Sequence, residues 1–95
     1  MARRDFAAII GTIAEEASER TAARWRSRIL KQVATLADRP YLGAQDEHLG
    51  PGRRRVVVAP YLIVYEFASL TEIRVLRILH GARDLTTLFR QPSSD

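Results

Sequence analysis

Residues 56–84 read VVVAPYLIVYEFASLTEIRVLRILHGARD, the part of the chain with the strongest secondary-structure signal. It contains two runs rich in β-branched and aromatic residues, 61–67 and 72–80, on either side of a short polar link. A third run, 54–58, precedes them across an Ala-Pro dipeptide. Strand-forming runs joined by short turns predict a three-stranded antiparallel meander. The remaining elements are therefore expected to pack against this sheet.

The composition indicates one small domain without disulfides. The chain has 95 residues, of which 46% are hydrophobic and none is cysteine. The lack of cysteine excludes a disulfide framework and thiolate catalysis, and it suits a reducing compartment. No apolar run approaches the roughly 18 residues of a membrane-spanning helix. The charged start is followed by no apolar run typical of a secretory signal, so we expect a cytoplasmic protein.

The charge favours an anionic partner. Fifteen basic residues against 11 acidic ones give a net charge of +4, and every basic residue except Lys31 is arginine. Arginine binds carboxylates and phosphates through its planar fork. The arginine-rich codon usage of a GC-rich genome explains the same bias equally well.

Two amphipathic helices are predicted before the sheet, at about 5–17 and about 19–37. Apolar residues recur in both at spacings of three and four, and Ser18 or Thr21 is the expected N-cap of the second helix. Because only a few residues join the helices, they must fold back as an antiparallel hairpin. The seams are Phe6, Ile9, Ile10, Ile13 and Ala17 in the first helix, and Ala22, Trp25, Ile29, Val33 and Leu36 in the second.

The rest of the chain is predicted as a loop over 38–52, the sheet over about 53–80, and a C-terminal segment over 81–95, in which a chain turn at 81–84 precedes a helical turn at 85–89. Both faces of the strands are largely apolar, whereas a helical hairpin covers only one of them. The second face is then expected to be an apolar surface that a partner chain covers. The fold class is therefore α+β.

Residues able to carry chemistry are few. His48 and His80 lie far apart without a neighbouring cysteine, so neither a metal site nor a nucleophile–base pair is expected. His80 is a general base or a phosphate contact in one interpretation, and a strand-end histidine bonded to the backbone in another. No metal and no other cofactor is predicted.

Arg77 is expected to lean inward. Strict alternation along its strand places it in phase with Val75, on a mostly apolar face. A lone buried charge is costly, which predicts an ion pair with Glu66 or Asp84. A recognition role for Arg77 stays open beside this structural one.

The arginine run 53–55 is the densest group of charges. It either grips phosphates or an acidic partner, or it marks a solvated strand entrance. The aromatic residues Trp25, Tyr61 and Tyr65 either stack on bases or belong to the core, and their helical and strand phasing favours the core.

Taken together, these segments resemble a known family. PYLIVYEF at 60–67, followed by IRVLRILHGARDLTTLF at 73–89, looks like the C-terminal half of ParE-type toxins in the RelE/ParE toxin–antitoxin superfamily. The upstream motifs LADRPYLG and LGPGRRR agree, as does the helical hairpin with Trp25. The resemblance spans about residues 3–89 and implies one toxin domain, 1–95, with a helical hairpin on one side of an antiparallel sheet.

The resemblance also implies a function. ParE members poison DNA gyrase, which stalls replication, and a neighbouring gene encodes an antitoxin that neutralises them. The RelE branch instead cuts messenger RNA on the ribosome, with basic residues and a C-terminal tyrosine or histidine. Here Arg83 matches one basic position, but Phe89 cannot transfer a proton and Val57 stands near another basic position. The ParE branch is therefore favoured, and a nuclease would have to use His80, Arg77 and Arg83.

One departure concerns the start of the chain. Members of the superfamily usually begin with a β-strand, whereas this sequence reaches its first helix almost at once. Either the true start lies upstream, or one strand is lacking and a sheet edge is exposed. The second case admits a truncated, inactive toxin that only binds antitoxin.

These considerations give two sets of site residues and two partners. A cognate antitoxin and DNA gyrase are the expected partners, whereas a membrane and base-specific binding of nucleic acid are not expected. The antitoxin-binding set is Trp25, Ile29, Tyr61, Ile63, Tyr65 and Arg77, and the target-binding set is Arg53, Arg54, Arg55 and Arg83.

Overall fold

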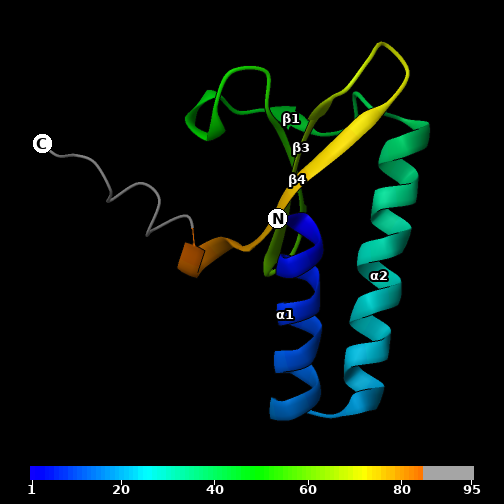
Figure 1. The fold of residues 1–95 in the computed structure, drawn as a ribbon, viewed down its shortest axis with the longest axis vertical. Coiled ribbons are helices and arrows are strands. Elements are labelled where there is room, and N and C mark those ends of the chain that lie inside the picture. Colours follow the sequence, from blue (N-terminus) through cyan, green and yellow to red (C-terminus); the bar gives the residue numbers. More distant parts are fainter. Residues whose placement is uncertain (85–95) are drawn as a thin grey trace, which may run out of the picture.

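The computed structural model describes residues 1–84, which fold into a helical hairpin and an antiparallel sheet (Figure 1). Residues 81–84 begin a helical turn after the last strand, while the turn predicted at 85–89 lies outside the described residues. The α+β class is confirmed. The elements are α1 (Ala2–Glu16), α2 (Glu19–Asp38), β1 (Ala44–Gln45), the 3₁₀-helix η1 (Glu47–Leu49), β2 (Arg54–Val58), β3 (Tyr61–Phe67) and β4 (Ile73–His80).

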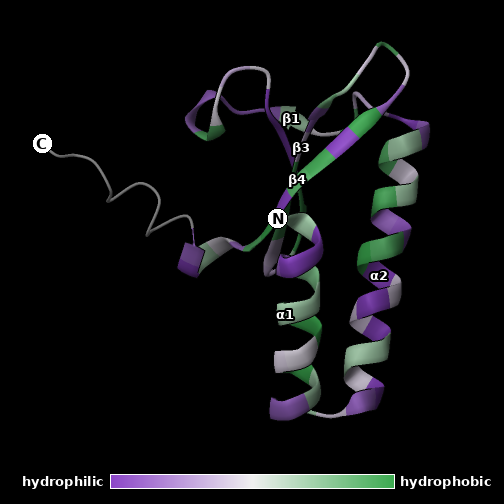
Figure 2. Ribbon diagram, in the orientation of Figure 1, coloured by the Kyte–Doolittle hydropathy of each residue, from purple (hydrophilic) through white to green (hydrophobic). Residues whose placement is uncertain are grey.

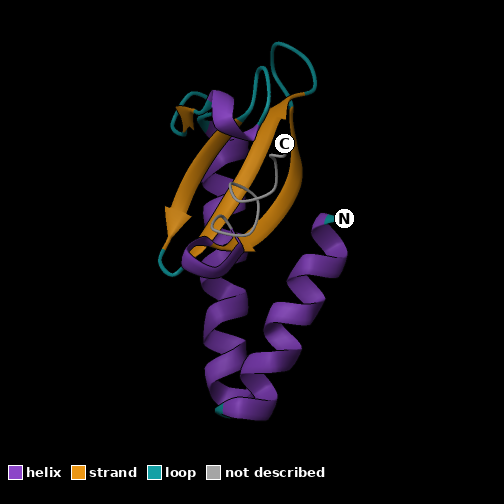
Figure 3. Cartoon of the chain, turned by 90° about the vertical axis from the view of Figure 1, so that its left-hand side faces the viewer, coloured by secondary structure: helices purple, strands orange, loops and turns teal. Residues whose placement is uncertain are grey.

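The two helices form the predicted antiparallel hairpin, whose closed end projects beyond the sheet in both views (Figures 1 and 3). The Ser18 side chain accepts a hydrogen bond from the Thr21 backbone N–H at 3.0 Å, so Ser18 is the N-cap of α2. This bond satisfies one of the N–H groups that lack a partner at a helix start. The first helix begins at Ala2, earlier than the predicted residue 5.

The sheet has the strand order β1-β2-β3-β4, and all its neighbours are antiparallel. The meander of β2, β3 and β4 is as predicted, but β1 is a fourth strand in the segment 38–52 that was expected to be a loop. Only Ala44 and Gln45 form it, paired with Arg55 and Arg54. Two residues carry no alternating pattern, so nothing in the sequence marks this strand.

The core lies between the helical hairpin and one face of the sheet. Tyr61, Ile63 and Tyr65 of β3 belong to this cluster, and Figure 2 shows the hydrophobic stretches of the helices and of β4. Packing these apolar side chains against one another removes them from water, which stabilises the hairpin on the sheet. The buried members are Ile29, Leu36, Val58, Ile63, Tyr65 and Ile78.

The opposite face of the sheet differs from the expectation. Leu62, Val64 and Leu79 form a second cluster there, with Leu49 of η1 packed against it. These three side chains are only 5%, 2% and 4% exposed. The prediction of an open apolar surface on this face is therefore wrong at this cluster, because its side chains are buried within the chain.

Tyr65 ties the segment after α2 to the sheet. Its hydroxyl donates to the Pro40 carbonyl at 2.7 Å and accepts from the Gly43 N–H at 2.8 Å. A Cβ at position 43 would lie 2.5 Å from the Tyr65 hydroxyl and 2.8 Å from the Arg55 carbonyl oxygen. Only glycine fits this approach, so the Tyr65–Gly43 contact fixes how the chain enters β1.

Candidate functional site

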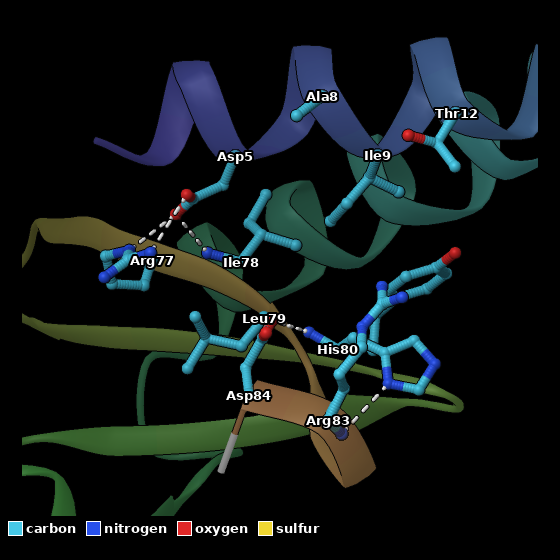
Figure 4. A pocket seen from close by; sticks show the side chains of 11 residues that line it. Asp5, Ala8, Ile9, Thr12, Arg77, Ile78, Leu79, His80, Arg83 and Asp84 are labelled. Carbon is cyan, nitrogen blue, oxygen red and sulfur yellow. Dashed lines mark hydrogen bonds and ion pairs between the residues drawn. The ribbon is translucent and has the colours of Figure 1, made fainter. Parts of the chain in front are cut away.

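A pocket of about 370 Å³ opens beside the last strand, between α1 and the helical turn at 81–84 (Figure 4). Its lining combines apolar side chains of α1 and β4 with charged side chains of α1, β4 and the turn. The lining residues are Asp5, Ala8, Ile9, Thr12, Tyr61, Arg77, Ile78, Leu79, His80, Arg83 and Asp84.

A β-bulge in β4 decides where Arg77 points. Val64 pairs with Arg77 and Tyr65 pairs with Val75, so Leu76 is an extra residue without a partner across the ladder. A bulge reverses the alternation of side chains beyond it. Arg77 therefore shares a face with Val64, and the predicted phase with Val75 is wrong.

From the edge of the sheet, Arg77 reaches α1 and pairs with Asp5. Its Nε lies 2.8 Å from Asp5 Oδ2, and its Nη2 lies 3.2 Å from Oδ1. The Ile78 backbone N–H also donates to Oδ2 at 3.0 Å. The side chains of Asp5 and Arg77 are 16% and 37% exposed, so the pair is partly shielded from water. This bidentate contact fastens the first turn of α1 to β4.

The two predicted partners of Arg77 are engaged elsewhere. Glu66 accepts from Arg74 at 2.8 Å, and Asp84 accepts from the His80 backbone N–H at 2.7 Å. The prediction of Glu66 or Asp84 is therefore wrong at both positions. Its premise, that Arg77 has a carboxylate partner, is confirmed.

The ion pair shifts the pKa values of both members. Burial, the largest single effect on Asp5, raises its pKa, but the bonds from Arg77 and Ile78 and the nearby positive charges outweigh it. The pKa of Asp5 is therefore below its ordinary value of 3.8. The hydrogen bond to Asp5 raises the pKa of Arg77, so both groups are charged at neutral pH.

His80 is held by the turn that follows it. Its Nδ1 accepts from the Arg83 backbone N–H at 3.3 Å, so a neutral ring carries its proton on Nε2. Its ring meets Tyr61 edge-on at 5.7 Å, and Tyr61 meets Trp25 edge-on at 5.2 Å. The basic nitrogen of His80 is thus engaged, and the row of three rings connects the pocket to α2.

The predicted antitoxin-binding residues fall into two groups. Ile29, Ile63 and Tyr65 are 0% exposed and build the core, so their side chains form no surface. Trp25 and Tyr61 are half-buried and lie next to the pocket. Trp25, Tyr61 and Arg77 are the members of this set that a partner can reach.

The arginine run 53–55 mainly holds the preceding loop. Arg53 donates to the Leu49 carbonyl at 3.1 Å, and Arg54 donates to the Gly43 carbonyl at 2.6 Å. Arg55 pairs with Asp46 at 3.4 Å.

The predicted target-binding residues do not form one surface. Arg54 pairs with Tyr65 near one end of β3, whereas Arg83 follows His80, which pairs with Tyr61 at the other end. By contrast, the predicted nuclease residues Arg77, His80 and Arg83 all line the one pocket.

Asp5 is the residue of this site that the sequence did not reveal. It lies 72 positions from Arg77, and its place in the first turn of a helix is explained by the helix dipole alone. Across residues 1–84 the structure shows no group of three residues able to hold a metal ion. In the same range no helix has the length and apolarity to cross a membrane.

The family of the chain follows from comparison with known proteins. The sequence model described as the ParE toxin of type II toxin-antitoxin system, parDE, matches residues 1–85. The chain belongs to the ParE toxin family. The predicted resemblance is thereby confirmed, and this ParE protein is the toxin component of a type II toxin–antitoxin module. The family implies a cognate antitoxin as its partner. A search of curated proteins finds no match.

Proposed function

We propose that this ParE toxin inhibits DNA gyrase by binding it in the cytoplasm, and that a cognate antitoxin keeps the toxin inactive. Membership of the ParE family supports the gyrase target, and the contacts in the pocket support binding over catalysis. The decisive observation is that Asp5 holds two guanidinium nitrogens of Arg77.

Cleavage of RNA would need free groups at this place. A cation must face the scissile phosphate, and a basic atom must take up the 2′-hydroxyl proton. Arg77 is engaged with Asp5, and Nδ1 of His80 accepts from the Arg83 backbone. Both groups support the fold, which favours a toxin that acts by occupying its target.

The test combines purified gyrase, relaxed plasmid and the toxin. We expect loss of supercoiling in proportion to the added toxin, and filamentation with DNA-damage signalling in cells that lack the antitoxin. The variant His80→Ala should keep most of this activity. Arrest of translation before DNA damage, with transcripts cut at ribosomes, would contradict the proposal.

A ribosome-dependent nuclease is the second candidate, because Arg77, His80 and Arg83 converge on one pocket. It predicts that His80→Ala abolishes toxicity and that Asp5→Ala, which frees Arg77, does not weaken it. An inactive toxin that only binds antitoxin is the third candidate, and it predicts no growth defect on expression.

For the antitoxin we propose a site around Trp25, Tyr61 and the pocket beside β4. Trp25→Ala should weaken the complex at least about tenfold, the size typical of an aromatic hot spot. Leu70→Ala is the control, because Leu70 is 89% exposed in the β3–β4 turn. Circular dichroism must show that Trp25→Ala is folded. If both variants bind the product of the adjacent reading frame as wild type does, the site lies elsewhere.

A further inference from the structure

The outer side of α2 carries a row of cations that neither the pocket nor the core uses. Arg20, Arg24, Arg28 and Lys31 follow one another at spacings of four, four and three, and all are exposed. This spacing places them on one side of the helix. The buried residues Ala22, Ile29 and Leu36 lie on the opposite side. We call the four residues the α2 cationic face.

The charge of this face is not neutralised within the described chain. Within the described residues, the ion pairs of Asp5, Asp46 and Glu66 involve none of these four cations. The segment 19–39 holds six basic residues and two acidic ones, a difference of +4, which equals the net charge of the whole protein. The positive field of the toxin is therefore concentrated on α2.

One member of the face is held in place. The Arg28 guanidinium lies 4.4 Å from the centroid of the Trp25 ring. Thr21, Arg24, Trp25 and Arg28 surround a shallow hollow of about 240 Å³ on the flank of the helix. A stacked arginine loses less conformational freedom when it binds an anion.

The chemistry of the face distinguishes between anionic partners. Protein–protein interfaces have an apolar centre with few charges, whereas here four exposed cations follow one another along the helix and the half-buried Trp25 ring lies at their edge, beneath Arg28. Protein–DNA interfaces are more polar and much more positive. From Arg20 to Lys31 the row rises by 11 residue steps, about 16 Å of helix, which matches about five phosphates of one strand along a duplex.

We propose that the α2 cationic face binds the phosphate backbone of duplex DNA without reading its sequence. The proposal is independent of the gyrase target, although a toxin that grips DNA would meet gyrase where that enzyme is already bound. Backbone contacts carry no base information, which is consistent with the absence of any predicted base-specific site.

The experiment measures binding of the full-length toxin to a fluorescent duplex by anisotropy between 50 and 200 mM salt. Four phosphate contacts predict a slope of about −3.6 in log K against log salt, a loss of about 150-fold over this range. Arg24→Glu with Lys31→Glu should lower the slope to about −1.8, a loss of about 12-fold. Duplexes of unrelated sequence should bind equally.

The matched control is Arg3→Glu with Arg4→Glu, two exposed arginines of α1 that give the same change in net charge. The control should retain the wild-type slope, and circular dichroism should show all proteins folded. Equal losses in both double variants, or no salt-dependent binding by wild type, would overturn the proposal. The proposal would also be overturned if reversing the charge of the α2 cationic face weakened the antitoxin complex but left DNA binding unchanged. The partner of the face would then be an acidic protein.

Discussion

The Asp5–Arg77 pair makes a measurable prediction about stability. Asp5→Ala removes a carboxylate that accepts two bonds from Arg77 and one from the Ile78 N–H. Hydrogen bonds to charged groups contribute about 1.5–3 kcal/mol each when well shielded. Because the Arg77 side chain is 37% exposed, solvent screening reduces this sum. We expect a loss of about 2 kcal/mol in the free energy of unfolding, and a fall of about 10 °C in Tm.

The assay is urea unfolding of wild type, Asp5→Ala, Arg77→Met and the double variant. The double-mutant cycle should give a coupling energy of about 1–2 kcal/mol. The control is the Glu66–Arg74 pair, which has the same 2.8 Å contact but a 60% exposed arginine. Its coupling energy should not exceed about 0.5 kcal/mol. An Asp5–Arg77 coupling energy as small as that of the control would mean that the partly shielded pair stabilises the fold no more than an exposed one.

The same pair predicts the effect of pH. The pKa of Asp5 lies below 3.8 in the folded protein, so unfolding raises it. Its contribution to stability is therefore fully present above the unfolded pKa and is lost as the pH falls through the folded one. The stability difference between wild type and Asp5→Asn should shrink below about pH 4. If the stability difference between the two proteins stayed constant down to acidic pH, the charge of the Asp5 carboxylate would not contribute to stability.

Three further substitutions test the packing, each by urea unfolding. Tyr65→Phe leaves the Pro40 carbonyl and the Gly43 N–H without their partner, and should cost about 2–3 kcal/mol; a cost below about 0.5 kcal/mol would mean that water replaces the hydroxyl. Gly43→Ala places a Cβ 2.5 Å from the Tyr65 hydroxyl, and should destabilise by at least about 1–3 kcal/mol. Gly11→Ala meets nothing within 4 Å and should stabilise α1 by about 0.5–1 kcal/mol. The two glycine substitutions should therefore change the free energy of unfolding in opposite directions. Changes in the same direction would contradict the packing described around Tyr65.

Much of the fold was predictable because its signals are local. The runs 54–58 and 61–67 are strands with the predicted bounds, since alternation and β-branched residues define a strand without its neighbours. The sequence reduced the N-cap of α2 to Ser18 or Thr21, and the bond from the Thr21 N–H to Ser18 identifies Ser18 as the cap. The division of β3 into two faces followed from the period of two, but the pattern did not show that the second face is buried within the chain.

The misses share a different cause, because each depends on contacts between distant segments. The bulge at Leu76 belongs to the pairing of β4 with β3, and it moved Arg77 to the other face. Asp5 and Arg77 are 72 positions apart in the sequence. At such a separation, opposite charge alone does not identify which residues pair. The strand phasing of Tyr65 favoured a core residue, and Tyr65 is 0% exposed, but the resemblance also placed it in the antitoxin-binding set, which its burial contradicts.

The separation of Asp5 from Arg77 also sets an order of events during synthesis. The turn between α1 and α2 brings the helices together through local contacts, whereas the ion pair must close a loop of 72 positions, and such loops close late. While β4 is still inside the ribosome, no carboxylate–guanidinium bond holds the first turn of α1. We therefore expect proteases to cleave nascent chains near the N-terminus far more readily than the finished toxin.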